Sequence, residues 1–167
     1  MIESQGKVLR WLVDEGREDL AAVHGMRSSA KNVMKHYDDF FEEVSTLWLA
    51  AWRGYADVVR GLIGRGADIN KADKDGGTPL HAASENGHVD VARLLVDSGA
   101  DIDKADEDGC SPLLIASQNG HVDVARVLVE GGADINKANE DGKTPLQIAR
   151  QRKHKEVVKL LRQAAKA

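Results

Sequence analysis

Apolar residues recur at helical spacing along the chain and are interrupted at short, regular intervals, most clearly in residues 78–110. Thr78 is a good helix N-cap, and Pro79 suits the first helical position because a missing N–H loses no partner there. A first helix is therefore predicted to begin here. Gly87 is predicted to end it after about two turns, in a left-handed conformation.

A second short helix is predicted directly afterwards. Val91, Leu94 and Leu95 fall on one helical face, and this helix is predicted to run to Gly99. Residues 100–109, which are rich in Asp and Gly, then predict an extended turn that reverses the chain. Isolated helices shorter than roughly 12 to 15 residues are marginal in water, so each helix needs a neighbour to pack on.

The same pattern recurs with a fixed period of 33 residues. Residues 111–143 repeat residues 78–110 at 23 of 33 positions, and residues 45–77 match them at 16 positions. A fourth copy starts at Thr144 and runs to Ala167. A fixed period of this size predicts stacked units rather than one globular core.

The repeated unit resembles the ankyrin repeat, whose 33-residue period carries a T-P-L-H-x-A signature. In this chain the matching residues are Thr78-Pro79-Leu80-His81-Ala82-Ala83, followed by Gly87-His88, Leu94-Leu95 and Gly99-Ala100-Asp101. The resemblance covers residues 45–167 and implies an all-α solenoid of helix-turn-helix units with short β-hairpin turns. Its units are residues 45–77, 78–110, 111–143 and 144–167, the last serving as a C-terminal cap.

Residues 1–44 depart from the regular pattern. Residues 8–16 align without a gap with residues 91–99, which indicates a second repeat helix whose partner helix is missing. The interval from Gly16 to Gly66 is 50 residues instead of 33, so 17 extra residues (50 − 33) follow this half unit. Within the insertion, Ser29 is predicted to cap a helix with apolar residues at helical spacing, namely Val33, Tyr37, Phe40, Phe41 and Val44.

The predicted role of residues 1–44 is an irregular helical N-terminal cap that covers the apolar side of the first full repeat. The alternative is an added docking surface, or a homodimer formed through these N-terminal helices. The sequence leaves the structure of residues 17–28 open.

Composition and charge exclude some classes of protein. Aromatic residues make up only 4% of the 167 residues, which suits helix seams built from Leu, Val and Ala. The net charge of −4 gives no sign of nucleic-acid binding, and the longest apolar stretch, residues 47–52, is too short to span a bilayer. A single cysteine, Cys110, and charges that interrupt residues 1–10 predict an intracellular protein, cytoplasmic or nuclear.

The first full repeat carries unusual aromatic residues. Trp52 and Arg53 occupy the positions of Glu85 and Asn86, which the resemblance places on inner helices facing a concave groove. Trp and Arg are enriched among interface hot spots. The alternative is that Trp48 and Trp52 pack on the N-terminal helix.

Turn tips form a net acidic row along one edge of the implied groove. The tips are residues 73–75, 106–108 and 139–141. One interpretation is a patch that steers a basic protein or peptide partner, and the other is a solvated turn in which Asp serves the backbone. The predicted partner-binding residues are Trp52, Arg53, Lys74, Asp75, Glu85, Asn86, Glu107, Asp108, Gln118, Asn119, Glu140, Asp141 and Gln151.

Three histidines are predicted to have structural roles. The resemblance implies that His81 bonds the capping Thr78 and that His88 and His121 tie neighbouring loops together.

The last unit is strongly basic. From Arg150 onward there are seven cations and one acid, Glu156, for a net charge of +6 (7 − 1). A charged outer face suits a terminal cap, and a nucleic-acid or anionic-membrane patch is the alternative.

No motif in the sequence indicates catalysis. There is no phosphate-binding Gly-rich loop after a strand, no paired cysteine motif and no metal-ligand spacing, so no metal or cofactor is predicted. Cys110 is the one conceivable nucleophile, and an exposed, unreactive thiol is predicted for it. The sequence therefore predicts a non-enzymatic module that binds a protein partner in the concave groove. The alternative is a structural or assembly protein, or an engineered scaffold, that dimerises through its N-terminal insertion.

Overall fold

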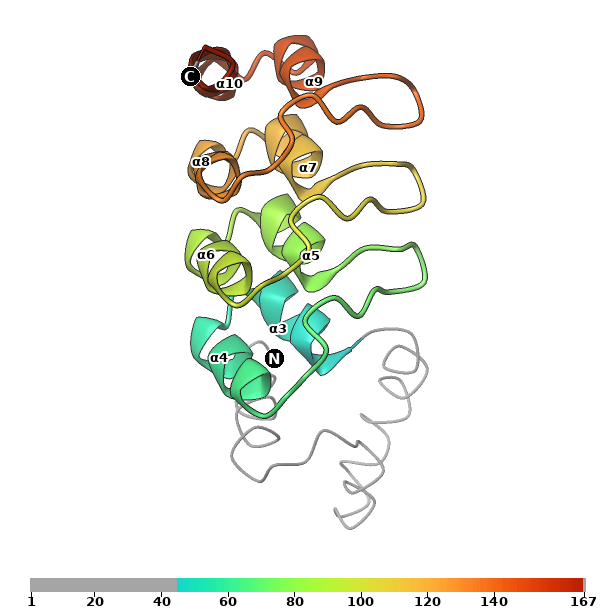
Figure 1. Ribbon diagram of the computed structural model, residues 1–167, viewed down its shortest axis with the longest axis vertical. Helices are drawn as coiled ribbons and strands as arrows, with labels where there is room; N and C mark the ends of the chain where they lie inside the picture. Colours follow the sequence, from blue (N-terminus) through green and yellow to red (C-terminus); the bar gives the residue numbers. More distant parts are fainter. Residues whose placement is uncertain (1–44, 167) are drawn as a thin grey trace, which may run out of the picture.

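The computed structural model describes residues 45–166, which form eight α-helices and no strand (Figure 1). The helices are α3 (Thr46–Arg53), α4 (Ala56–Gly64), α5 (Pro79–Asn86), α6 (Val89–Asp97), α7 (Pro112–Asn119), α8 (Val122–Glu130), α9 (Pro145–Gln151) and α10 (Lys155–Ala164). The predicted half repeat at residues 8–16, the helix after Ser29 and the N-terminal cap lie outside the described residues and stay predictions.

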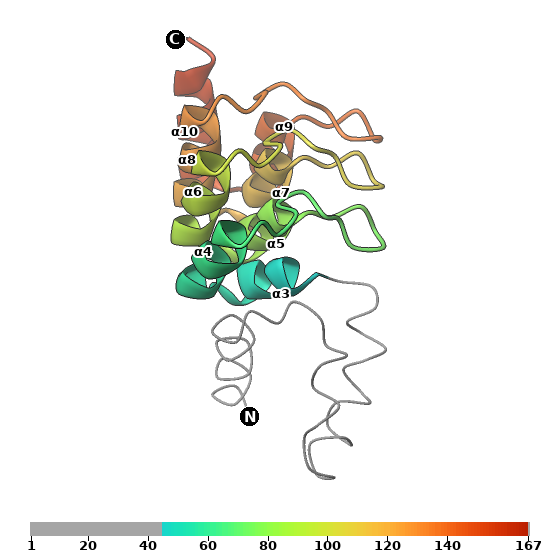
Figure 2. The ribbon, with the colours of Figure 1, turned by 60° about the horizontal axis from the view of Figure 1, so that its bottom comes forward.

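Helix pairs stack in two parallel columns. The inner helices α3, α5, α7 and α9 contact one another in order, as do the outer helices α4, α6, α8 and α10. Extended turns project from the side of the inner helices, as Figures 1 and 2 show from two directions. The predicted all-α repeat solenoid is confirmed.

The inner helices begin at the predicted caps. The Thr78 side chain accepts a hydrogen bond from the backbone N–H of His81, and Pro79 occupies the first helical position. Ser45, Ser111 and Thr144 cap their helices in the same way. Residues that favour N-caps at a 33-residue interval therefore fix where each unit starts.

The core is a continuous seam between the units. Leu95, Leu128 and Leu161 on the outer helices are at most 1% exposed. Ala83, Ala116 and Ala149 are fully buried on the inner helices, where a small side chain allows close approach of the next helix. Because each helix is shorter than an isolated helix needs to be, this shared burial holds the units in place.

Glycines at the ends of the inner helices allow neighbouring units to approach closely. Gly87 has φ +74, and a Cβ atom placed there would lie 2.6 Å from the His121 ring of the next unit. Gly54 and Gly120 have the same geometry against the rings of His88 and His154. The corresponding residue of the last unit is Lys153, which adopts φ 66 despite its side chain. The left-handed end of the first helix that Gly87 predicts is thus confirmed, and it recurs in every unit.

Candidate functional site

The exposed ends of the inner helices and the turn tips carry the predicted partner-binding residues. Ten of the thirteen are exposed: Lys74, Asp75, Glu85, Asn86, Glu107, Asp108, Asn119, Glu140, Asp141 and Gln151. Trp52, Arg53 and Gln118 are half-buried. None is buried, so all thirteen present some surface to solvent.

A ladder of histidines fixes the backbone beneath three of these side chains. Each Nε2 atom donates to a carbonyl oxygen of the preceding unit: His88 to Trp52 (3.0 Å), His121 to Glu85 (2.9 Å) and His154 to Gln118 (2.9 Å). The predicted roles of His88 and His121 are confirmed. The helix ends are thereby held in register while their side chains remain available for contact.

The first residue of each turn tip serves the backbone. The Asp73 carboxylate accepts hydrogen bonds from the N–H groups of Asp75 (3.1 Å) and Gly77 (2.8 Å). The Asp106 carboxylate and the Asn139 amide oxygen accept equivalent bonds. The structural interpretation of the tips therefore holds for these three residues.

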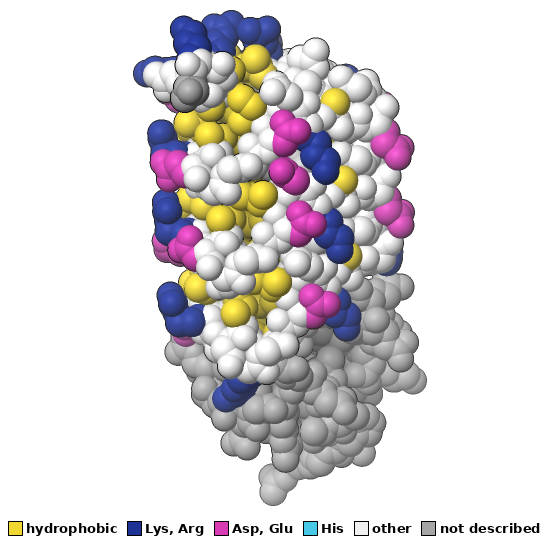
Figure 3. All heavy atoms as spheres, viewed as in Figure 1, with side chains coloured by type: hydrophobic (Ala, Val, Ile, Leu, Met, Phe, Trp, Pro, Cys, Tyr) yellow, Lys and Arg dark blue, Asp and Glu magenta, His cyan; other side chains and the backbone are white. Residues whose placement is uncertain are grey.

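The second and third residues of each tip are exposed and lie side by side. The Glu107 N–H donates to the Asp75 carbonyl oxygen (3.0 Å), and the Glu140 N–H donates to the Asp108 carbonyl oxygen (3.1 Å). These backbone bonds hold the three tips next to one another, and the tips carry five exposed acidic residues, which we call the acidic strip: Asp75, Glu107, Asp108, Glu140 and Asp141. Figure 3 shows Asp and Glu side chains along the edge from which the turns project. Asp141 forms an ion pair at 4.0 Å with Lys143, whose side chain is 41% exposed, and a pair this open to solvent adds little in water.

The aromatic residues of the first unit form a small cluster. The rings of Trp48 and Trp52 stack with centroids 6.3 Å apart and an interplanar angle of 13°. The Arg53 guanidinium lies 4.6 Å above the Trp52 ring, within range of a cation–π interaction. Trp48 and Trp52 also pack against the core of the described units. The alternative that they contact the N-terminal helix concerns residues outside the described range.

His81 has the structural role that the sequence predicts. Its Nδ1 atom accepts a hydrogen bond from the Thr78 N–H (3.1 Å), so its Nε2 atom carries the proton and donates to the Cys110 carbonyl oxygen (3.0 Å). Burial lowers the pKa of His81, although the Cys110 hydrogen bond opposes this shift. A neutral, fully bonded imidazole of this kind links two units.

The expected exposure of the Cys110 thiol is wrong. Cys110 is only 8% exposed and packs against Leu114 and Ile148. The residue directly follows a turn, but its side chain enters the seam between two inner helices. Burial, and after it the Asp106 carboxylate, raises the pKa of the thiol. The side chain is therefore an uncharged core residue and not a reactive nucleophile.

A second ladder, which the sequence reasoning missed, connects the loops after the outer helices. The Asn70 side-chain oxygen accepts a bond from the Asp101 N–H (2.9 Å), and Lys104 donates to the Asn70 carbonyl oxygen (3.2 Å). Asp103 receives the equivalent bonds from Asp134 and Lys137. The sequence does carry a signal for these bonds, because an Asn or Asp (Asn70, Asp103) and a Lys (Lys104, Lys137) recur at the 33-residue interval.

Other kinds of site find no support in the described part of the chain. Residues 45–166 contain no group of three His, Cys, Asp or Glu side chains arranged to hold a metal. Across the same range, no helix has the length and apolarity needed to cross a bilayer.

Comparison with known families agrees with this architecture. The family model described as "Ankyrin repeats (3 copies)" matches residues 3–106, 47–139 and 104–167. The chain belongs to the ankyrin-repeat family. A search of curated proteins finds no match. Ankyrin repeats are generally protein–protein interaction modules, and the family is typically non-enzymatic.

Proposed function

We propose that this ankyrin-repeat protein binds a protein partner in a concave groove between its inner helices and its turn tips. The observation that carries the proposal is that backbone hydrogen bonds hold neighbouring tips together while the acidic residues on them stay exposed. A rigid row of like charges lowers the loss of conformational freedom on binding, because the backbone that presents it is already ordered.

The acidic strip favours a basic partner segment. Five carboxylates lie on three adjacent tips, with Lys74 and Lys143 as the neighbouring cations. Charge complementarity of this kind speeds encounter and selects the partner more than it adds affinity. The strip therefore supplies specificity in the proposal, and another contact must supply most of the affinity.

Trp52 and Arg53 supply that anchor in the proposal. Both are half-buried, and the Arg53 guanidinium is held against the Trp52 ring. A preorganised aromatic and cationic pair that is partly open to solvent has the features of an interface hot spot. The exposed polar ends of α5 and α7, with Glu85, Asn86 and Asn119, continue the contact surface from this anchor.

The proposal is tested by reversing charge on one tip. The full chain is immobilised, and proteins captured from a native extract are compared between the unaltered protein and a Glu107→Lys/Asp108→Lys variant. The matched control is Asp97→Lys/Glu130→Lys, which makes the same charge change at exposed positions on the outer helices α6 and α8. Both variants are first checked for unchanged helical content.

The expected result is a protein that the unaltered chain and the control retain and that the tip variant loses. Its association should also weaken as salt rises, because exposed charges are screened. Capture that is equal for all three forms, or lost equally in both variants, would refute binding along the acidic strip.

A further inference from the structure

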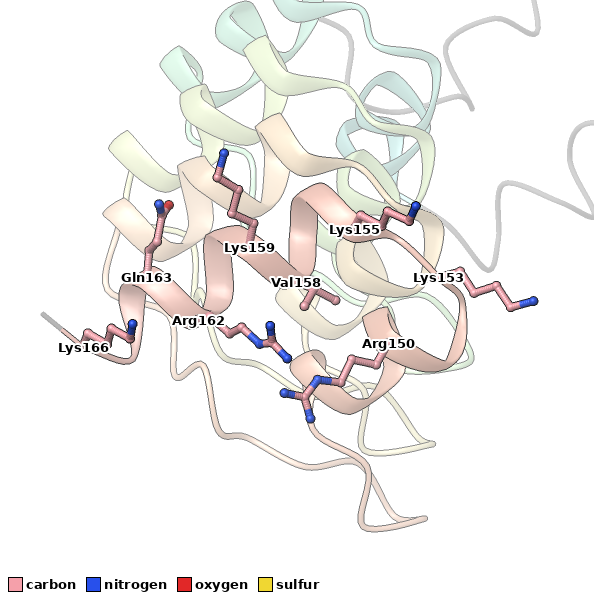
Figure 4. A pocket seen from close by; sticks show the side chains of 8 residues that line it. All are labelled: Arg150, Lys153, Lys155, Val158, Lys159, Arg162, Gln163 and Lys166. Atoms are coloured by element: carbon pink, nitrogen blue, oxygen red, sulfur yellow. The ribbon is translucent and has the colours of Figure 1, made fainter.

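A basic surface lies at the end of the stack, on the last described unit. It is a shallow hollow lined by Arg150, Lys153, Lys155, Val158, Lys159, Arg162, Gln163 and Lys166, all labelled in Figure 4. We call it the basic end face. Figure 3 shows Lys and Arg side chains gathered at this end, around α10.

Three residues of the basic end face occupy positions that earlier units use for stacking. Arg150 stands where Ser84 and Ser117 are fully buried, and Val158 stands where Ala92 and Ala125 are fully buried. Arg162 likewise replaces Val96, which lies close to the following unit: a Cβ atom on Gly131 would meet Val96 at 2.8 Å. The face thus carries two arginines and a valine where earlier units carry small or apolar residues at their stacking surface.

This face is not built to receive another repeat. In earlier units a histidine ring of the next unit sits against a glycine, and Lys153 occupies that glycine position. Stacking an apolar face here would also remove Arg150 and Arg162 from water without a partner, which is unfavourable. The occupant that suits this face must therefore carry negative charge.

The cations of the end face lack acidic partners. Within residues 45–166, none of the six forms an ion pair, and all six are exposed. Figure 4 shows the side chains of Arg150 on α9 and Arg162 on α10 extending toward one another near Val158. Both guanidinium groups line the same hollow, and each matches a carboxylate in a bidentate geometry.

We propose that the basic end face binds an acidic segment of a partner protein, separately from the groove. Carboxylates of the segment pair with Arg150 and Arg162, while Val158 and the aliphatic stems of the lysines contact its apolar side chains. This inference concerns a second surface and does not depend on the acidic strip.

Other anionic partners fit less well. Single-stranded nucleic acid is usually held by aromatic side chains between cations, and the eight lining residues include no aromatic. A membrane surface requires apolar side chains to insert, but Val157, Leu160 and Leu161 of α10 are buried against the stack. A short acidic protein segment needs neither feature.

The test measures fluorescence anisotropy of a labelled oligoglutamate peptide titrated with the full chain. The unaltered protein is expected to bind it saturably, and Arg150→Glu/Arg162→Glu to bind at least about tenfold more weakly, because two charge-assisted contacts are lost. The charge-neutral pair Arg150→Gln/Arg162→Gln gives the same comparison without added repulsion. The matched control Arg93→Glu/Arg126→Glu, at exposed positions on α6 and α8, should stay within about twofold.

Three results would overturn the proposal. They are no saturable binding by the unaltered chain, an equal loss in the matched control, and tighter binding of a DNA duplex or phosphatidylserine vesicles than of oligoglutamate. Trp52→Ala should leave oligoglutamate binding unchanged, so this experiment tests binding at the basic end face separately from partner binding in the groove.

Discussion

The Nε2 atom of His121 lies 2.9 Å from the carbonyl oxygen of Glu85, and the same imidazole ring leaves no room for a side chain at Gly87. One residue therefore links two units twice, through a hydrogen bond and through a close approach that only glycine permits. This relationship recurs at each junction between described units and holds the ends of the inner helices in register.

Substitutions at the left-handed helix ends should have opposite effects in the middle and at the end of the stack. Gly87→Ala should destabilise by about 1 to 3 kcal/mol, because φ is +74 and the new Cβ meets the His121 ring. Lys153→Gly should stabilise slightly, by up to about 1 kcal/mol, because it relieves φ 66. Urea unfolding followed by circular dichroism measures both. A destabilised Lys153→Gly variant would contradict the assigned conformation.

Core and surface positions should differ sharply in their effect on stability. Leu95→Ala removes a fully buried side chain from the seam and should lower the free energy of unfolding by about 2 to 5 kcal/mol. Glu107→Ala, at an exposed tip, should change it by less than about 0.5 kcal/mol. Both are read from the same unfolding curves, and similar losses from the two would mean that the buried faces are wrongly assigned.

His81 should make stability depend on pH. Its folded pKa lies below the ordinary histidine value of about 6.5, chiefly because the ring is buried. The unfolded chain then binds more protons than the folded chain in the window below pH 6.5. The His81 contribution is therefore fully present above about pH 6.5 and is lost as pH falls from there toward the folded pKa.

The matched variant is His81→Gln, because Gln147 forms the same capping box with Thr144 in the last unit. The variant keeps the cap and removes the titrating group. Unfolding experiments between pH 7 and pH 5 should show the unaltered protein losing more stability than the variant. Parallel pH profiles would show that His81 is not responsible.

The Cys110 thiol should be protected in the folded protein. Because it is buried and its pKa is raised, a thiol-specific chromogenic reagent should react at least about a hundredfold more slowly in buffer than in denaturant. Cys110→Ser should remove the reaction altogether. Equal rates in the two conditions would mean that the side chain lies at the surface.

The repeat period predicts most of the fold and only part of the site. The boundaries of the first helix are predicted by Thr78, Pro79 and Gly87, because capping and left-handed conformations depend on local chemistry. The burial of Cys110 was not predictable in this way, because it depends on how a neighbouring unit packs across the turn. The stacking of Trp48 on Trp52 likewise depends on ring orientation, which spacing alone leaves undetermined.

The turn tips are a second case in which the sequence predicts the element but not the role of each residue. Their Asp-rich sequence fits both a backbone role and a contact role, and the structure divides the two between adjacent residues. Asp73 serves the turn, whereas Asp75 is exposed on the acidic strip. The two aspartates cannot be told apart in the sequence, because only the path of the backbone determines which carboxylate bonds to the turn.

The most direct test of the central claim is the affinity of the captured partner for Trp52 variants, measured by calorimetry. Trp52→Ala should weaken binding by about 2 kcal/mol, or roughly 30-fold, and should lower stability by about 1 to 3 kcal/mol through the lost ring stacking and the lost packing against the core. Trp52→Phe, which keeps a ring beside Trp48 and Arg53, should retain most of the affinity. Unchanged affinity in a folded Trp52→Ala protein would contradict partner binding at this surface.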